Sequence, residues 1–199
     1  MGIYKRKKGD KGSLKWIQIL INNRPDTINL QIRRNFKIPA RTEIEWVSPL
    51  GGKSYAEYRD KDFLKVLGIS PHRVSLMDFW PKGGPQWDAL GKLSDGSVVL
   101  FEAKAHISEV ISHIQAINRN SIKFIEKSLE RTKKELGVRT KNPWTTPFYQ
   151  YANRIAHLHF LRNLNRIRSY LIFVNFIGDD EMGGPKSELE WSGAINLIQ

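Results

Sequence analysis

The sequence predicts an α/β fold in which a sheet of about four strands is flanked by helices, with a helical extension at the N-terminus. Residues 97–104 are rich in β-forming side chains and follow the turn signal Ser94-Asp-Gly. Residues 169–177 are a continuous apolar run, which is expected of a central strand covered on both faces. Between these two strands, apolar residues recur at helical spacing. The predicted order is therefore helices, a three-strand meander, further helices and a last buried strand.

Length and composition fit a single domain. The 199 residues are 40% hydrophobic, which is enough for one sizeable core. We divide the domain into a basic arm with a helical extension, residues 1–40, and an α/β core, residues 41–199. No apolar run approaches the length of a membrane span, and the basic start lacks the apolar segment of a secretory signal, so no membrane association is expected.

Charge and cysteine content narrow the classes of function. The chain has no cysteine, which excludes disulfides, zinc–thiolate sites and cysteine nucleophiles and fits a cytoplasmic protein. Its net charge of +12 argues for a polyanionic partner, most simply nucleic acid. Anionic membrane surfaces, or solubility alone, would explain the same charge.

Local signals place the remaining elements. Residues 1–12 are lysine-rich and are expected to form a mobile arm, followed by core-packing helices that begin near Ser13 and at Pro25. The other elements are expected as strands over 42–48 and 73–80 and as helices over 54–67, 107–117, 121–136 and 148–163. The acidic residues 179–181 are expected to form a solvated turn.

Three polar residues converge on the hairpin that residues 87–104 are expected to form. Side chains alternate along a strand, so Glu102 and Lys104 lie on one face while Phe101 and Ala103 lie on the other. Asp88, on the neighbouring strand, reaches the same surface. Two carboxylates suit Mg²⁺ or Mn²⁺, and an adjacent lysine can orient or deprotonate a water that attacks phosphorus. The alternative is a solvated Glu/Lys pair on an edge hairpin.

Asp88 followed by Glu102-Ala-Lys104 resembles the PD-(D/E)xK nuclease superfamily, which has the restriction-endonuclease-like fold. The resemblance covers the middle and C-terminal two thirds of the chain, and the arrangement also looks like a group of uncharacterised bacterial members. It departs from the pattern at Trp87, which stands where a proline precedes the first acid in the superfamily. The resemblance implies a restriction-endonuclease-like core with a central mixed sheet.

The resemblance also implies a site. Asp88, Glu102 and the backbone carbonyl of Ala103 would bind Mg²⁺ or Mn²⁺, and Lys104 would lie beside the attacking water. A helix before the hairpin often supplies a further acidic ligand, for which Glu57 is the candidate and Glu45 the rival. Gln150 corresponds to a glutamine that several branches place on a helix beside the active site. An exposed first-turn glutamate explains Glu57 equally well.

Cationic residues supply candidate contacts to nucleic acid. A basic stripe on the expected helix 121–136, with Arg154 behind Gln150, has the residue types that bind phosphate, namely Lys123, Lys127, Arg131, Lys134 and Arg154. Glu126 and Glu130 also allow ordinary pairs on a solvated helix face. The two interpretations of the stripe stay open.

Two functions from different classes follow. The first is a metal-dependent nuclease that hydrolyses phosphodiester bonds, with DNA as the expected substrate. The second is a nucleic-acid-binding module or partner subunit that keeps the fold without cleaving. Many relatives act as dimers to cut two strands, so a homodimer is left open. An unrelated α/β domain with accidental spacing is the third interpretation.

Overall fold

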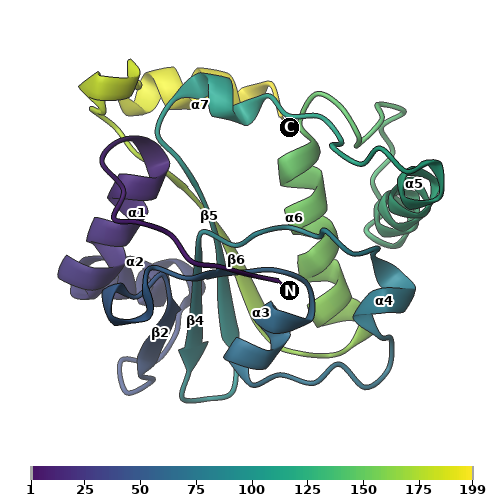
Figure 1. Ribbon diagram of the computed structural model, residues 1–199, viewed down its shortest axis with the longest axis horizontal. Helices are drawn as coiled ribbons and strands as arrows, with labels where there is room; N and C mark the ends of the chain where they lie inside the picture. The colour runs from purple at the N-terminus through teal and green to yellow at the C-terminus, as the bar shows by residue number, and fades with distance from the viewer. Residues whose placement is uncertain (1, 199) are drawn as a thin grey trace.

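The computed structural model describes residues 2–198 and has a mixed four-stranded sheet between two layers of helices (Figure 1). The strand order is β2-β4-β5-β6, with bounds Ile44–Ser48, Ala89–Leu93, Val98–Lys104 and Ser169–Asn175. The first three strands are antiparallel neighbours, whereas β6 runs parallel to β5. The expected α/β class and the mixed sheet flanked by helices are confirmed.

Strand β5 is the centre of the sheet, and its two faces have different chemistry. Phe101 and Ala103 pack in the core cluster that contains Ile17 and Ile32 of the N-terminal helices. On the opposite face, Leu100 packs with the helices that follow the hairpin. The predicted alternation along residues 97–104 is therefore confirmed, because Glu102 and Lys104 share the face of Leu100.

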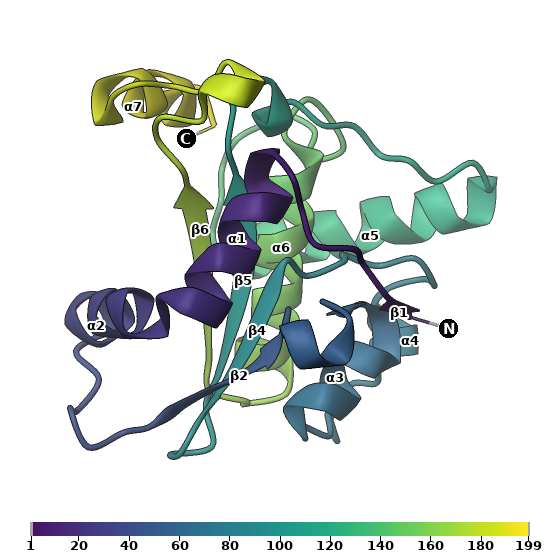
Figure 2. The ribbon, with the colours of Figure 1, turned by 60° about the vertical axis from the view of Figure 1, so that its left-hand side comes forward.

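Each face of the sheet carries its own helices. Helices α1 (Gly12–Asn23) and α2 (Pro25–Phe36) cover one face, and α6 (Tyr149–His159) covers the other, as the two views show (Figures 1 and 2). Helix α5 (Arg119–Glu135) packs against α6. The shorter elements are η1 (Gly51–Lys53), α3 (Asp60–Leu67), α4 (Leu76–Phe79), η2 (Ile107–Val110), the π-helical turn η3 (Phe160–Leu164), η4 (Asp180–Met182) and α7 (Glu188–Asn196).

The N-terminal segment is held against the domain, so the expected mobile arm is wrong for the residues described. Strand β1 (Ile3–Tyr4) pairs with β3 (Glu57–Tyr58). The Arg6 N–H then donates to the Ser54 carbonyl at 3.0 Å, and the Gly9 N–H donates to Gln18 Oε1 at 2.7 Å. These bonds fix a run of exposed lysines on the surface.

The expected helix over residues 54–67 begins only at Asp60. Ser54, Tyr55 and Asp60 have positive φ angles of 54°, 47° and 51°. A helix cannot pass through such left-handed backbone, so the chain forms β3 first and then α3. Because these residues are not glycine, composition did not signal the break.

Two other expected elements are also wrong. Residues 73–80 form a helical turn, because the Ser75 hydroxyl accepts the Asp78 N–H and caps α4. Residues 107–117 form only η2 and then an extended segment. Ser112 there makes a bridge with Phe148, and Ile117 is 95% exposed. The apolar spacing of this segment does not mark a buried helix face.

The C-terminal elements differ in detail from expectation. Strand β6 lies at the edge of the sheet rather than at its centre, and most of its side chains are only half-buried. The expected helix over 148–163 is confirmed as α6, which ends in the π-helical turn η3. Asp179 is 1% exposed, so the expected solvated turn holds for Asp180 and Glu181 but not for Asp179.

Across residues 2–198, none of the helices combines the length and the apolar character that crossing a membrane requires.

We expect Phe101→Ala to lower the free energy of unfolding by about 3–5 kcal/mol, because the side chain is fully buried between β5 and the N-terminal helices. Chemical denaturation would measure the change. Ile117→Ala removes an exposed aliphatic side chain and should change stability by less than about 0.5 kcal/mol. A small effect at Phe101 would contradict the core assignment.

Candidate active site

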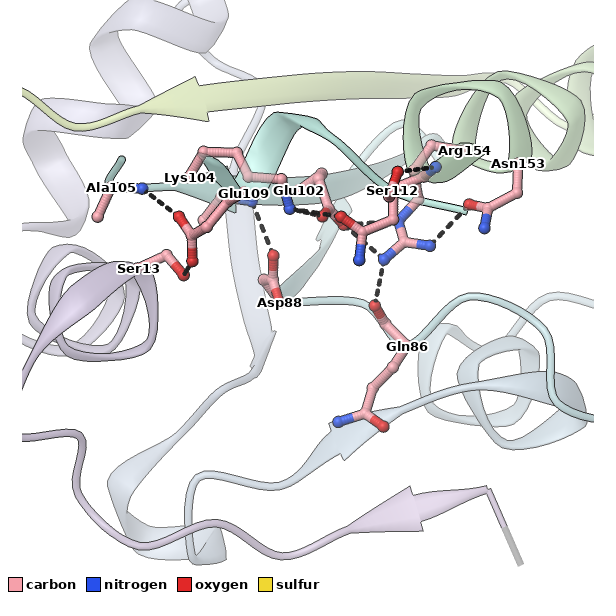
Figure 3. Close-up of polar contacts among 12 residues, drawn as sticks. Ser13, Gln86, Asp88, Glu102, Lys104, Ala105, Glu109, Ser112, Asn153 and Arg154 are labelled. Carbon is pink, nitrogen blue, oxygen red and sulfur yellow. Dashed lines mark hydrogen bonds and ion pairs between the residues drawn. The ribbon is translucent and has the colours of Figure 1, made fainter. Parts of the chain in front are cut away.

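The hairpin brings Asp88 next to Glu102, as the sequence predicts. Asp88 immediately precedes β4, and its N–H donates to the Phe101 carbonyl at 3.3 Å. Its Oδ2 accepts the Ala103 N–H at 2.7 Å (Figure 3). Strand β5 continues past the start of β4, so the Asp88 carboxylate takes the place of a strand partner at Ala103.

Glu102 lies in a buried ion cluster. Lys104 Nζ contacts its Oε1, and Arg154 Nε donates to its Oε2 at 2.7 Å. The three residues are only 2–5% exposed. Removing such a carboxylate from water is costly unless cations replace the lost hydration, and here both of its oxygens are paired.

Gln150 lies beside this cluster, where the sequence placed it. It is in the first turn of α6, and its Oε1 accepts a hydrogen bond from Lys104 Nζ at 2.9 Å. Its own N–H donates to Ser112 Oγ at 2.9 Å. The Lys104 ammonium therefore has a fixed position between a carboxylate and an amide, both from rigid elements.

Arg154 is on the expected helix stripe, but its guanidinium is buried rather than presented at the surface. Besides Glu102, it donates to the Gln86 carbonyl and to Asn153 Oδ1, both at 2.8 Å. It also lies over the Trp87 ring, 5.0 Å from the centroid. The sequence predicts that Arg154 contacts phosphate, but its guanidinium is buried and bound to Glu102. The spacing of the sequence shows that Arg154 lies one helical turn after Gln150. It does not show that Glu102 would contact Arg154.

Glu57 is close to the site but belongs to a separate contact. It is on β3 rather than on a helix, is 2% exposed, and accepts Arg6 Nε at 3.0 Å and the Gln86 side-chain amide. Gln86 therefore connects Glu57 to Arg154 through its two ends. The structure does not bring Glu57 together with Asp88 and Glu102 as a third carboxylate.

Glu45 is also away from the site. It is exposed on β2 and pairs in register with Lys92, which is opposite Val98 at the start of β5. Lys104 is six residues further along, which corresponds to about 20 Å of extended strand. The rival acid is therefore at the far end of the sheet.

Burial raises the pKa of Asp88, and the negative charge of Glu102 adds to this effect. Lys104, the Ala103 N–H and Arg154 oppose it. The result is a pKa of about 8, compared with an ordinary value of 3.8. At neutral pH the Asp88 carboxyl is therefore mainly protonated in this arrangement.

The donors that a hard cation would use are Asp88, Glu102 and the Ala103 carbonyl. In a strand, the N–H and C=O of one residue point to the same side, so the Ala103 carbonyl lies on the edge where its N–H meets Asp88. Oxygen donors of this kind suit Mg²⁺ or Mn²⁺. Within residues 2–198, no three His, Cys, Asp or Glu side chains form a group that could hold a metal. The donor set thus depends on two carboxylates and a backbone oxygen.

Two residues beside the cluster were not identified as functional from the sequence. Glu109 accepts the Ala105 N–H at 2.6 Å and the Ser13 hydroxyl at 3.0 Å, which ties α1 to the end of β5. Tyr151 stacks on Phe173 with ring centroids 4.6 Å apart. Burial, with smaller contributions from Glu102 and Glu109, raises the pKa of Tyr151 to about 12. Nothing in the local pattern distinguishes Tyr151 from a packing residue.

The two histidines of α6 are structural, as expected. His157 is fully buried among aromatic rings and its Nδ1 bonds to the Asn153 carbonyl at 2.8 Å. Burial lowers its pKa to about 3, so the imidazole stays neutral. His159 contacts Glu135 at 2.7 Å and thereby joins α6 to α5.

The predicted basic stripe lies on the exposed side of α5. Its members Lys123, Lys127, Arg131 and Lys134 are all exposed, and Arg131 pairs with Glu135 at 2.7 Å. Within the described part of the chain, no ion pair involves Lys123, Lys127 or Lys134. These ammonium groups are exposed on the surface of α5.

Comparison of the chain with protein-family models, with curated proteins and with solved structures found no match.

The raised pKa of Asp88 predicts a pH dependence of stability. Between about pH 4 and about pH 8 the folded protein keeps a proton that the unfolded chain releases, so the contribution of Asp88 to the free energy of unfolding falls as pH rises. The free energy of unfolding of Asp88→Asn, relative to that of wild type, should therefore increase by more than about 1 kcal/mol when the pH is raised from about 5 to about 9. Thermal unfolding at both pH values would measure this. The exposed Asp180→Asn should show no such gain, and a pH-independent difference at Asp88 would contradict the assignment.

The ion cluster predicts strong coupling between Glu102 and Arg154. Arg154→Met should lower the free energy of unfolding by about 3–5 kcal/mol, because it removes one of two cations from a buried carboxylate. Glu102→Gln should cost much less in that background than in wild type. A double-mutant cycle by chemical denaturation should give more than about 1 kcal/mol of coupling. The exposed pair Lys186 and Asp180 is the control, with an expected coupling near zero.

Proposed function

We propose that this protein is a metal-dependent nuclease that hydrolyses phosphodiester bonds of DNA and has a restriction-endonuclease-like core. The observation that carries the proposal is the meeting of Asp88, Glu102 and Lys104 at one edge of β5, where a carboxylate replaces a strand partner. The Asp88 carboxylate accepts the Ala103 N–H, and Lys104 contacts Glu102.

Each residue of the site has a role in the proposed reaction. Asp88, Glu102 and the Ala103 carbonyl would hold Mg²⁺ or Mn²⁺, which supplies a Lewis acid and lowers the pKa of bound water. Lys104 orients a water or stabilises negative charge on phosphate, and Gln150 keeps its ammonium in place. Arg154 balances the charge of Glu102.

The surface charge supports a nucleic-acid partner. The net charge is +12, and the exposed cations of α5 are joined by Lys5, Lys7 and Lys8 of the anchored N-terminal segment. Lysines fixed on a surface bind phosphates without reading sequence, and their contribution falls as salt rises. DNA is the partner we propose on this basis.

A non-cleaving nucleic-acid-binding module is the second candidate, and one observation favours it. Both oxygens of Glu102 are already paired, with Lys104 and with Arg154. A metal would have to compete with these cations, whereas a purely structural ion cluster needs no such exchange. The two functions share the basic surface and differ only in what the cluster does.

Cleavage of DNA with Mg²⁺ or Mn²⁺ tests the proposal. Lys104→Met and Glu102→Gln should each lower the cleavage rate by more than about a hundredfold. Lys92→Met and Glu45→Gln make the same chemical changes elsewhere on the sheet and should leave the rate unchanged. Manganese titration by calorimetry should show binding to wild type that Glu102→Gln abolishes. DNA binding without cleavage, together with no manganese binding, would establish the second candidate.

The basic stripe predicts the salt dependence of binding. Lys123→Glu with Lys127→Glu should weaken DNA binding and reduce the slope of log affinity against log salt by up to about two, because about one phosphate contact is lost per lysine. Fluorescence anisotropy over a salt series would measure it. Arg34→Glu with Arg41→Glu changes the net charge equally on the other side of the sheet. If both pairs act alike, net charge rather than the α5 surface governs binding.

A further inference from the structure

A second candidate site lies next to the ion cluster, on the other side of the first turn of α6. A cavity of about 530 Å³ is lined by the loop after α5, by α6 and by the C-terminal residues. Its lining combines the aromatic rings of Trp144, Phe148 and Tyr151 with the polar side chains of Thr140 and Asn142. Mostly apolar walls with a few polar groups are typical of cavities that hold a flat organic ligand.

The cavity and the ion cluster share structural parts. Tyr151 forms part of the cavity wall and stacks on Phe173, which is opposite Glu102 in the β5–β6 register. The preceding residue, Gln150, holds Lys104. Consecutive residues of α6 thus contribute to the ion cluster and to the cavity wall.

The approach to the cavity is cationic. Residues 119–141, which form α5 and the start of the loop, contain eight cationic and three anionic residues. Arg139 and Lys141 are exposed and alternate with the lining residues Val138, Thr140 and Asn142. Phosphates that follow this basic segment would arrive at the aromatic walls.

We propose that this cavity holds one unstacked nucleobase of a single-stranded or locally unpaired nucleic acid, an inference that rests on the proposed function and specifies its substrate class. Aromatic walls bind a base by stacking, whichever base it is, and the adjacent cations hold its backbone. The protein therefore binds unpaired nucleotides, with the base in the cavity and a neighbouring phosphate at Lys104.

The test uses short oligothymidylates that carry the fluorescent base 2-aminopurine at each position in turn, with chelator present so that no cleavage occurs. One position should show a strong change in emission on binding, because the base leaves its stack and enters the aromatic cavity. An abasic nucleotide at that position should weaken binding on the order of tenfold, and a duplex of the same sequence should bind more weakly.

Matched substitutions separate the cavity from general effects. Ile155→Trp fills the cavity and should abolish the position-specific signal, while Ile117→Trp makes the same change on the exposed segment and should preserve it. If Ile155→Trp has a melting temperature well below that of wild type, Trp144→Ala replaces it and should also abolish the signal. Trp16→Ala removes a half-buried tryptophan away from the cavity and should preserve the signal.

The outcomes distinguish this inference from the proposed function. Equal binding by the cavity variants and their controls, or a preference for duplex, overturns the cavity assignment even if wild type cleaves DNA. Loss of the signal in the cavity variants supports it even if no cleavage is found with any divalent metal, in which case the nuclease proposal alone fails.

Discussion

The pairing of the buried Glu102 carboxylate with two cations is the interaction on which the rest of the structure depends. Glu102 lies on the central strand and is only 2% exposed, so both of its oxygens need a partner that replaces the lost hydration. Lys104 supplies one from the same strand. Arg154 supplies the other from α6, which fixes how that helix is rotated against the sheet. The position of Gln150, and with it the aromatic cavity, follows from this rotation.

The cluster also explains why the two faces of β5 differ. One face is an ordinary apolar core under α1 and α2, which makes the strand rigid. The other face carries charges that are costly to bury and contribute little to stability once they are balanced. The charged face therefore contributes less to the stability of the sheet than the apolar face does.

Local patterns predicted the elements whose own sequence determines them. The hairpin, α5 and α6 were recognised because their alternation or helical spacing agrees with their burial. The site was predicted in part, since neighbouring strands necessarily bring Asp88 to Glu102. The partners of Glu57 and Arg154 were not predictable, because they come from contacts between distant segments. Left-handed backbone at Ser54 and Tyr55 was equally hidden, because neither residue is glycine.

Proteolysis of the N-terminal segment would disturb the interior of the domain, because this segment supplies a partner for a buried charge. Arg6 is the cation that pairs with the buried Glu57, and Gln86 connects Glu57 to the cluster around Arg154. A protease cut between Arg6 and α1 would remove few residues and no part of the four-stranded sheet, yet it would leave a carboxylate in the interior without its counter-charge. Loss of a short surface strand would thus destabilise the interior because a buried charge loses its partner, and not because packing contacts are lost.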